Sequence, residues 1–165
     1  MRRRVSALVC VALMIIVPSA LGQERPAETG SNYVPVTAYD PSRNAAHDIQ
    51  NAIAETHRTG KRILLEIGGN WCGWCHTMDK FFEQNPKLLA LREENFVLVK
   101  VNFSKENKNE MLLANYPHIP GYPHLFVLDS EGKLLHSQDT SQLELGKSYD
   151  LKKFTAFLKK WGRRP

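Results

Sequence analysis

The chain has 165 residues, of which 42% are hydrophobic and 24% are charged, and its formal net charge is +5. This size suits a single domain with an adequate core, and the sequence contains no internal repeat and no low-complexity tract. Part of the excess positive charge lies in residues 2–4, so the composition gives little support to nucleic-acid binding.

The N-terminus has the pattern of a signal peptide. A basic start at residues 2–4 precedes an apolar run over residues 5–17, and the small residues Ala20 and Gly22 suit cleavage before Gln23. The apolar run is shorter than the about 20 residues that a transmembrane helix needs, although an uncleaved anchor remains the alternative. We therefore expect three segments: a signal peptide over 1–22, a polar lead-in over 23–40 and one domain over 41–165.

The first part of this domain predicts a helix followed by a strand. Asp40-Pro41-Ser42 is typical of a helix start, apolar residues follow at helical spacing, and Gly60 is a natural end. Residues 62–67 are apolar except for Glu66, which predicts a short buried strand. Gly68-Gly69-Asn70 then interrupts the strand.

The middle of the chain predicts two helical pieces and a second strand. The first helix starts at Cys72 and carries Met78 and two phenylalanines on one face, and Asn85-Pro86 interrupts it. Three leucines between positions 88 and 91 indicate a further helical piece. Residues 96–101 read as another buried strand.

The last part predicts a helix over 109–116, a hairpin and a final helix. Strands over 124–128 and 133–136 flank the turn sequence Asp129-Ser130-Glu131-Gly132, and residues 137–148 are expected to be loop. Asp150 can cap the final helix. The order α-β-α-β-α-β-β-α predicts an α/β protein with a mixed central sheet and helices on both faces.

Beyond the signal peptide, Cys72 and Cys75 are the only cysteines. A bond between two residues so close in sequence closes almost no loop and adds little stability, so the pair is expected to serve reactivity. The sequence Cys72-Gly73-Trp74-Cys75-His76 fits a redox-active dithiol, a c-type haem attachment site, or a zinc pair completed by His76. The alternation of strands and helices disfavours a haem site. In such a site His76 would be the proximal ligand of the haem iron, and Met78 lies too close to it in sequence to be the distal ligand.

Three features together resemble the thioredoxin-fold superfamily. The stretch GGNWCGWCH places Trp71 and the dithiol at the start of a helix, Glu66 precedes Cys72 by six residues, and GYPHLFVLD places Pro123 directly before a strand and hairpin. The chain is similar to exported bacterial thioredoxin-like proteins with a WCxWCH motif, over residues 45–161. The resemblance implies a thioredoxin-like fold, a Cys72–Cys75 disulfide and thiol-disulfide exchange without a cofactor or metal.

The resemblance also implies a division of labour among the site residues. Cys72 lies at a helix N-terminus, where free N–H groups stabilise a thiolate, so it should be accessible and should attack the substrate. Cys75, shielded in the first turn, should resolve the mixed disulfide, and Glu66 beneath it should accept its proton.

The remaining implied site residues concern substrate docking. A cis bond before Pro123 would expose the backbone of Tyr122 to an extended segment, and Trp71, Trp74 and Tyr122 would form an apolar rim. Cysteine-containing client proteins are the expected substrates of a monomer that exchanges electrons with a membrane electron donor or an oxidant, in the periplasm of a Gram-negative bacterium. Gly73-Trp74 stands where thioredoxin has Gly-Pro, which leaves the direction of electron flow open.

Alternative interpretations remain for the protein and for its histidines. The fold also occurs as a non-catalytic binding module, which would not need Cys72. His76, His118 and His124 are expected to be solvated side chains rather than ligands or proton carriers.

Overall fold

The computed structural model describes residues 33–163. The expected signal peptide over residues 1–22 lies outside the described residues, as does most of the expected lead-in. Within residues 33–163, every helix is too short or too polar to cross a bilayer.

A four-stranded mixed sheet forms the centre of the domain, in the order β2-β1-β3-β4. Strand β1 (Arg62–Gly68) pairs in parallel with β2 (Phe96–Asn102) and antiparallel with β3 (His124–Leu128), which pairs antiparallel with β4 (Leu134–Asp139). The central position of β1 explains why its residues 63–68 are all buried. The predicted mixed sheet is confirmed.

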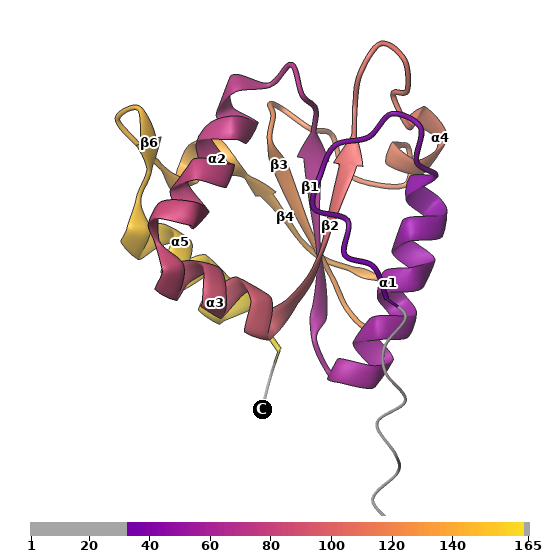
Figure 1. Ribbon diagram of the computed structural model, residues 1–165, viewed down its shortest axis with the longest axis horizontal. Helices are drawn as coiled ribbons and strands as arrows, with labels where there is room; N and C mark the ends of the chain where they lie inside the picture. Colours follow the sequence, from indigo (N-terminus) through magenta and orange to yellow (C-terminus); the bar gives the residue numbers. More distant parts are fainter. Residues whose placement is uncertain (1–32, 164–165) are drawn as a thin grey trace, which may run out of the picture. The chain divides into compact units, whose positions relative to one another are not determined.

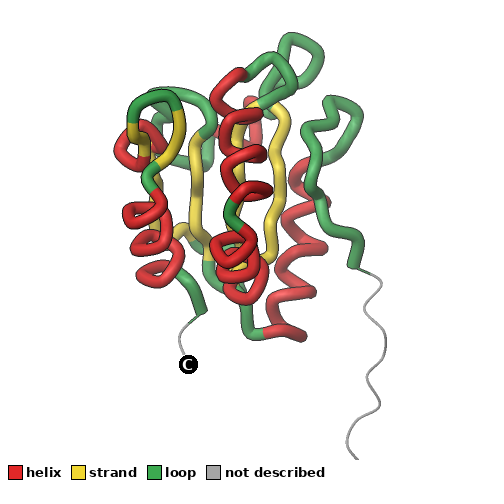
Figure 2. Tube along the Cα trace, turned by 60° about the vertical axis from the view of Figure 1, so that its left-hand side comes forward, coloured by secondary structure: helices red, strands yellow, loops and turns green. Residues whose placement is uncertain are grey.

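Helices cover both faces of this sheet (Figures 1 and 2). Helix α1 (Ala45–Thr59) lies on one face, and the other face carries α2 (Gly73–Gln84), α3 (Pro86–Asn95) and α5 (Leu151–Trp161). Each face has its own apolar core, since alternate residues of a strand point to opposite sides. The predicted α/β thioredoxin-like fold is confirmed.

Several predicted boundaries are also confirmed by local chemistry. Gly60 ends α1 with a positive φ of 67°, and Pro86 occupies the first turn of α3. The Asp150 carboxylate caps α5 by accepting from the N–H groups of Lys152 and Lys153.

The start of α1 differs from the prediction. Asn44 is the N-cap, and its side chain accepts a hydrogen bond from His47 N–H at 3.1 Å. Asp40 instead accepts from the backbone and side chain of Ser42, in a turn that precedes the helix. Both residues are good caps, so the local sequence could not distinguish them.

The expected helix over 109–116 and the expected loop over 137–148 are both wrong in part. Helix α4 (Glu110–Leu113) is a single turn. Strand β4 continues to Asp139, and a 3-10 helix (Thr140–Leu143) and a small hairpin of β5 (Glu144–Leu145) and β6 (Ser148–Tyr149) follow. The hairpin is held by the buried Tyr149, whose ring packs against Phe154 of α5.

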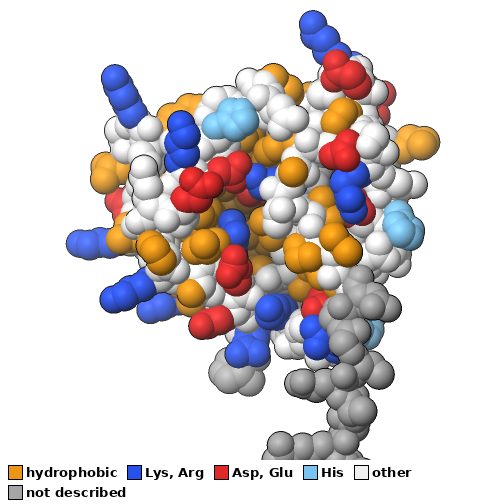
Figure 3. All heavy atoms as spheres, viewed as in Figure 1, with side chains coloured by type: hydrophobic (Ala, Val, Ile, Leu, Met, Phe, Trp, Pro, Cys, Tyr) orange, Lys and Arg blue, Asp and Glu red, His pale blue; other side chains and the backbone are white. Residues whose placement is uncertain are grey.

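Residues 33–40 run along the outer edge of β2. Val36 forms a parallel bridge with Val99, and Lys100 N–H donates to the Val36 carbonyl at 3.0 Å. Val36 and Tyr39 are both buried. On the face seen in Figure 3, basic and acidic side chains are interspersed rather than gathered by sign.

The role of Asn44 as the N-cap of α1 can be tested by mutation. Asn44→Ala should lower the free energy of unfolding by about 1 kcal/mol, because one N–H group of the first turn loses its partner. Asn51→Ala, in the exposed middle of the same helix, should be neutral or slightly stabilising because alanine favours helices. Urea denaturation measures both. Equal effects of the two changes would show that the helix is capped elsewhere.

Candidate functional site

The two cysteines lie at the N-terminus of α2, above the end of β1. Cys72 is the N-cap, and Cys75 lies in the first turn and donates its N–H to Cys72 Sγ at 3.1 Å. The two sulfurs form a disulfide, with the Cα atoms 5.2 Å apart. The dithiol therefore sits where unpaired helix N–H groups favour negative charge.

Gly68 allows this close approach of helix and strand. A Cβ atom on Gly68 would lie 2.5 Å from Cys75 Sγ and 2.7 Å from the Tyr39 hydroxyl oxygen. Neither contact is compatible with a side chain there, so the glycine has a steric role beyond the strand break expected from the sequence.

The expected accessibility of Cys72 is wrong for this disulfide-bonded form. Cys72 is 3% exposed and Cys75 is fully buried. Tyr39 packs with the two cysteines, and Trp74 and Tyr122 lie against the same cluster. Two residues expected at the rim, Trp74 and Tyr122, thus pack against the cluster that contains the buried Cys72.

Glu66 lies in the centre of the sheet and is 1% exposed. Its Oε1 accepts a hydrogen bond from the Tyr39 hydroxyl at 2.5 Å and lies 3.5 Å from Lys100 Nζ. Burial raises the pKa of the Glu66 carboxyl above its usual value, against the opposing effects of the Lys100 charge and the Tyr39 hydrogen bond. The carboxyl therefore takes up a proton at a higher pH than an exposed glutamate does.

A second carboxylate connects this buried pair to the surface. Glu66 and Lys100 are partners in the β1–β2 register, so their side chains share one face of the sheet. Lys100 Nζ also contacts Asp79 of α2 at 2.5 Å, and the Asp79 side chain is 37% exposed. The three charges form a row from the sheet interior to solvent.

Two of the three residues expected to form the apolar rim, Trp71 and Tyr122, contact each other, and Phe103 joins them. Trp71 is 58% exposed, donates its indole N–H to the Phe103 carbonyl and meets Tyr122 edge-on at 5.5 Å between ring centroids. Tyr122 also stacks on the Phe103 ring at 4.9 Å. Trp74 is half-buried and packs edge-on against Tyr149.

The Tyr122–Pro123 peptide bond is cis, the isomer that the resemblance implies. Pro123 is buried directly before β3, and its carbonyl accepts a hydrogen bond from the Thr140 hydroxyl at 2.5 Å. The half-buried Tyr122 lies against the cysteine cluster.

The three histidines differ from one another. His76 is exposed and its Nε2 bonds to the Asn70 carbonyl at 2.9 Å, while His118 is exposed. His124 was expected to be solvated, and this is wrong: it is 2% exposed, because it lies in β3 between β1 and β4. Its Nε2 lies 2.8 Å from the Ser137 hydroxyl, and burial lowers the pKa of its imidazole to about 4.

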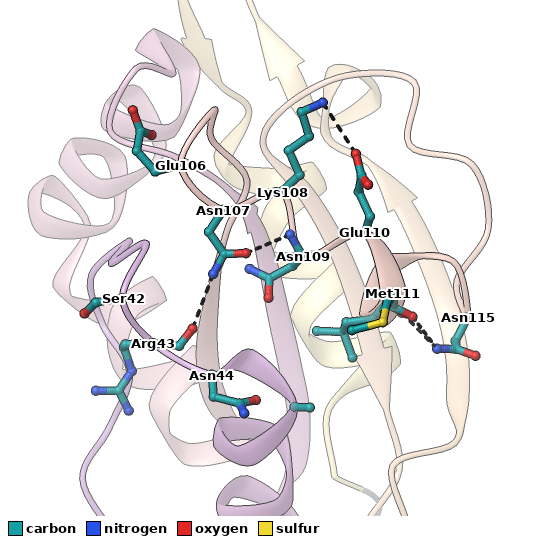
Figure 4. A pocket seen from close by; sticks show the side chains of 12 residues that line it. Ser42, Arg43, Asn44, Glu106, Asn107, Lys108, Asn109, Glu110, Met111 and Asn115 are labelled. Atoms are coloured by element: carbon teal, nitrogen blue, oxygen red, sulfur yellow. Dashed lines mark hydrogen bonds and ion pairs between the residues drawn. The ribbon is translucent and has the colours of Figure 1, made fainter.

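An open groove of about 850 Å³ lies between the start of α1 and residues 106–112 (Figure 4). None of the dithiol, Glu66 or the rim residues lines this groove. Among the described residues, no three His, Cys, Asp or Glu side chains are grouped as metal ligands.

Four residues of the site were missed by the sequence analysis: Tyr39, Asp79, Lys100 and Phe103. Lys100 follows from Glu66 once the parallel register of β1 and β2 is known, but that register has no local signature. Tyr39 precedes Glu66 by 27 residues and lies in the segment expected to be a lead-in. No pattern in the sequence indicates that contact.

Comparison with known proteins agrees with this geometry. Residues 43–130 match a family model described as thioredoxin-like. The thiol:disulfide interchange protein DsbD of Citrobacter koseri is 25% identical over 101 residues, which are 61% of this chain and 16% of that protein. The disulfide bond reductase DsbH of Chlamydia pneumoniae is 32% identical over 80 residues, covering 44% of this chain and 48% of that protein. The chain thus spans less than half of the length of these relatives.

A solved structure extends the likeness over a whole domain. The disulphide isomerase from Xylella fastidiosa Temecula1 superposes with a TM-score of 0.62 at 27% identity, covering 78% of this chain and 98% of that one. The family match includes β1, the dithiol, β2 and the cis-proline strand, and it extends over more than half of the chain. The chain therefore belongs to the thioredoxin-like family.

Proposed function

We propose that the protein is an exported thiol-disulfide oxidoreductase that exchanges its Cys72–Cys75 disulfide with cysteine-containing client proteins. The observation that carries this proposal is the disulfide at the start of α2, which packs with Tyr39, whose hydroxyl donates to the buried carboxylate of Glu66. The relatives named as interchange protein, reductase and isomerase support the same chemistry.

Reduction of a client begins at Cys72. Its thiolate, stabilised by the N–H groups of α2, attacks one sulfur of the client disulfide. A Cys72–client bond forms, the client disulfide breaks, and the second client sulfur leaves as a thiolate. The protein and client are then joined by a mixed disulfide.

Release of the client requires Cys75. Once its thiol proton has passed to Glu66, the Cys75 thiolate attacks Cys72 Sγ, the bond to the client breaks, and the client leaves as a thiolate that takes up a proton. Two electrons have then passed from the protein dithiol to the client. When these steps run in reverse, the protein transfers its disulfide to the client. The redox partner therefore sets the direction of electron transfer. A membrane electron donor or an oxidant can fill that role.

Clients dock on the aromatic surface around the dithiol. Trp71, Tyr122 and Phe103 form a contiguous apolar contact area beside the cysteines. The backbone of Tyr122 lies next to Pro123, at the position where an extended segment can pair as an added strand. Trp74 and Tyr122 pack against the cysteine cluster, so their movement would open Cys72 to a client.

The division of labour between the cysteines can be tested by trapping. Cys75→Ser should accumulate covalent complexes with client proteins that a reductant releases, because the mixed disulfide cannot be resolved. Cys72→Ser should accumulate few and should lose exchange activity, and the double variant is the background control. Non-reducing gel electrophoresis reads out all three. The opposite pattern would reverse the roles, and no trapping by either variant would favour a binding module.

Glu66→Gln should slow resolution by roughly 10²-fold while Cys72 still attacks, because the proton acceptor is lost. Glu66 accepts a proton only when ionised, so the wild-type resolution rate should fall as the pH drops through the raised pKa of this group. The glutamine variant should lack that dependence. Glu83→Gln, an exposed position of the same helix as the dithiol, is the matched control. An unchanged rate and pH profile in Glu66→Gln would remove Glu66 from the mechanism.

Denaturation provides a second readout of the same carboxyl. The pKa of Glu66 is higher in the folded state, so folding is favoured by the bound proton. The free energy of unfolding should therefore fall as the pH rises through the folded pKa, by about 1.4 kcal/mol for each unit of difference. Glu66→Gln should remove this slope.

Export of the protein is tested by its mass. The basic start and apolar run predict cleavage after Gly22, so the mature form should begin near Gln23. Fractionation of a Gram-negative host followed by intact-mass measurement identifies the compartment and the first residue. A mature protein that retains residues 1–17 would instead be an anchored enzyme.

A further inference from the structure

We propose that the Tyr39 hydroxyl relays the proton between Cys75 and Glu66 during resolution. This inference deepens the proposed oxidoreductase function and rests on it. The relay assigns a chemical role to a residue that lies before the family match, in a segment remote in sequence from the dithiol.

The first support is the position of the hydroxyl oxygen. It donates to Glu66 Oε1 at 2.5 Å, and it lies 2.7 Å from the place that a Cβ on Gly68 would occupy. Cys75 Sγ lies 2.5 Å from that same place. Glu66 and Gly68 are alternate residues of β1 and face the same side of the sheet. The hydroxyl that is bonded to the carboxylate and the sulfur of Cys75 therefore lie near the same point above Gly68.

The second support is that this hydroxyl stays protonated. Tyr39 is buried, and burial together with the neighbouring Glu66 charge raises the pKa of its phenol well above the usual value. A neutral hydroxyl can donate one proton and accept another, as a relay requires. The charged and titratable groups that act on Tyr39 and Glu66 come from four elements: Asp79 of α2, Arg92 of α3, Lys100 of β2 and Tyr149 of β6.

The third support is that separate contacts hold Tyr39 in place. The Asn70 side chain donates to the Tyr39 carbonyl at 3.2 Å, and Lys100 Nζ lies 4.8 Å from the centre of the ring. The Asn107 side chain donates to the carbonyl of Pro41 at 2.9 Å and to that of Arg43 at 3.5 Å, and Figure 4 shows Asn107 beside Arg43. These bonds tie the turn after Tyr39 to the loop after β2.

The relay step moves two protons and leaves Tyr39 unchanged. As the Cys75 thiol gives its proton to the Tyr39 oxygen, the hydroxyl gives its own proton to Glu66. The Cys75 thiolate then forms the bond to Cys72 Sγ and breaks the bond to the client, as described above. Glu66 holds the proton until it leaves toward solvent or the client thiolate.

The test is Tyr39→Phe, which keeps the ring and removes the hydroxyl. Reduced protein is mixed with the disulfide of thionitrobenzoate in a stopped-flow instrument. The first equivalent of thionitrobenzoate reports attack by Cys72, and the second reports resolution by Cys75. We expect the second phase to slow at least about tenfold and to lose its pH dependence, while the first phase is unchanged. Tyr33→Phe, which removes a hydroxyl from the same segment, should leave both phases unchanged.

A measurement on the wild-type protein does not depend on folding of the variant. The rate of the second phase in mixtures of light and heavy water should curve with deuterium fraction, since two protons move in the relay. A linear dependence would overturn the relay, as would an unchanged second phase and pH profile in Tyr39→Phe alongside a slowed Glu66→Gln. Failure of the oxidoreductase proposal looks different, because the wild-type protein would then release no second equivalent.

Discussion

The site depends on the burial of one carboxylate in the centre of an apolar sheet. An isolated charge there would be very unfavourable, so the structure surrounds Glu66 with a hydroxyl from Tyr39 and an ammonium from Lys100. Those partners come from the N-terminal segment and from β2, and Lys100 is itself paired with Asp79 of α2. Four segments of the chain therefore meet around the charge of Glu66: the N-terminal segment, β1, β2 and α2.

The cysteines themselves contribute chemistry rather than stability. Their bond closes a loop too short to constrain the unfolded chain, so opening it should cost the fold little. The fold positions the two cysteines. Cys72 is the N-cap of α2, and Gly68 leaves the space in which Cys75 packs closely against β1. Cys72 is buried in the disulfide-bonded form, in a cluster against which Trp74 and Tyr122 pack, so access to its sulfur requires a local rearrangement.

Sequence reasoning succeeded where the signal is local and failed where it is not. The dithiol, the buried strand around Glu66 and the turn before Pro123 each have a short pattern, and all three meet in the structure. The hairpin ending at Tyr149 is polar and half-exposed, so it lacks the alternation that marks a strand. Burial of His124 follows from the order of strands in the sheet, which its neighbours in sequence do not encode. The Tyr39 contact is likewise a product of the tertiary fold.

Residues 33–40 run along β2 and contribute to the site, so the folded domain extends beyond the residues that match the family model. The family match starts at residue 43 and ends at residue 130, so it omits Tyr39 at one end and α5 at the other. Transplanting only the matched stretch into a fusion protein would move the dithiol without the hydroxyl beside Glu66 and without α5, whose Phe154 and Leu158 share a core with Phe82. The Cys72–Cys75 motif lies inside the matched stretch, but the proposed proton relay also requires Tyr39, which lies outside it.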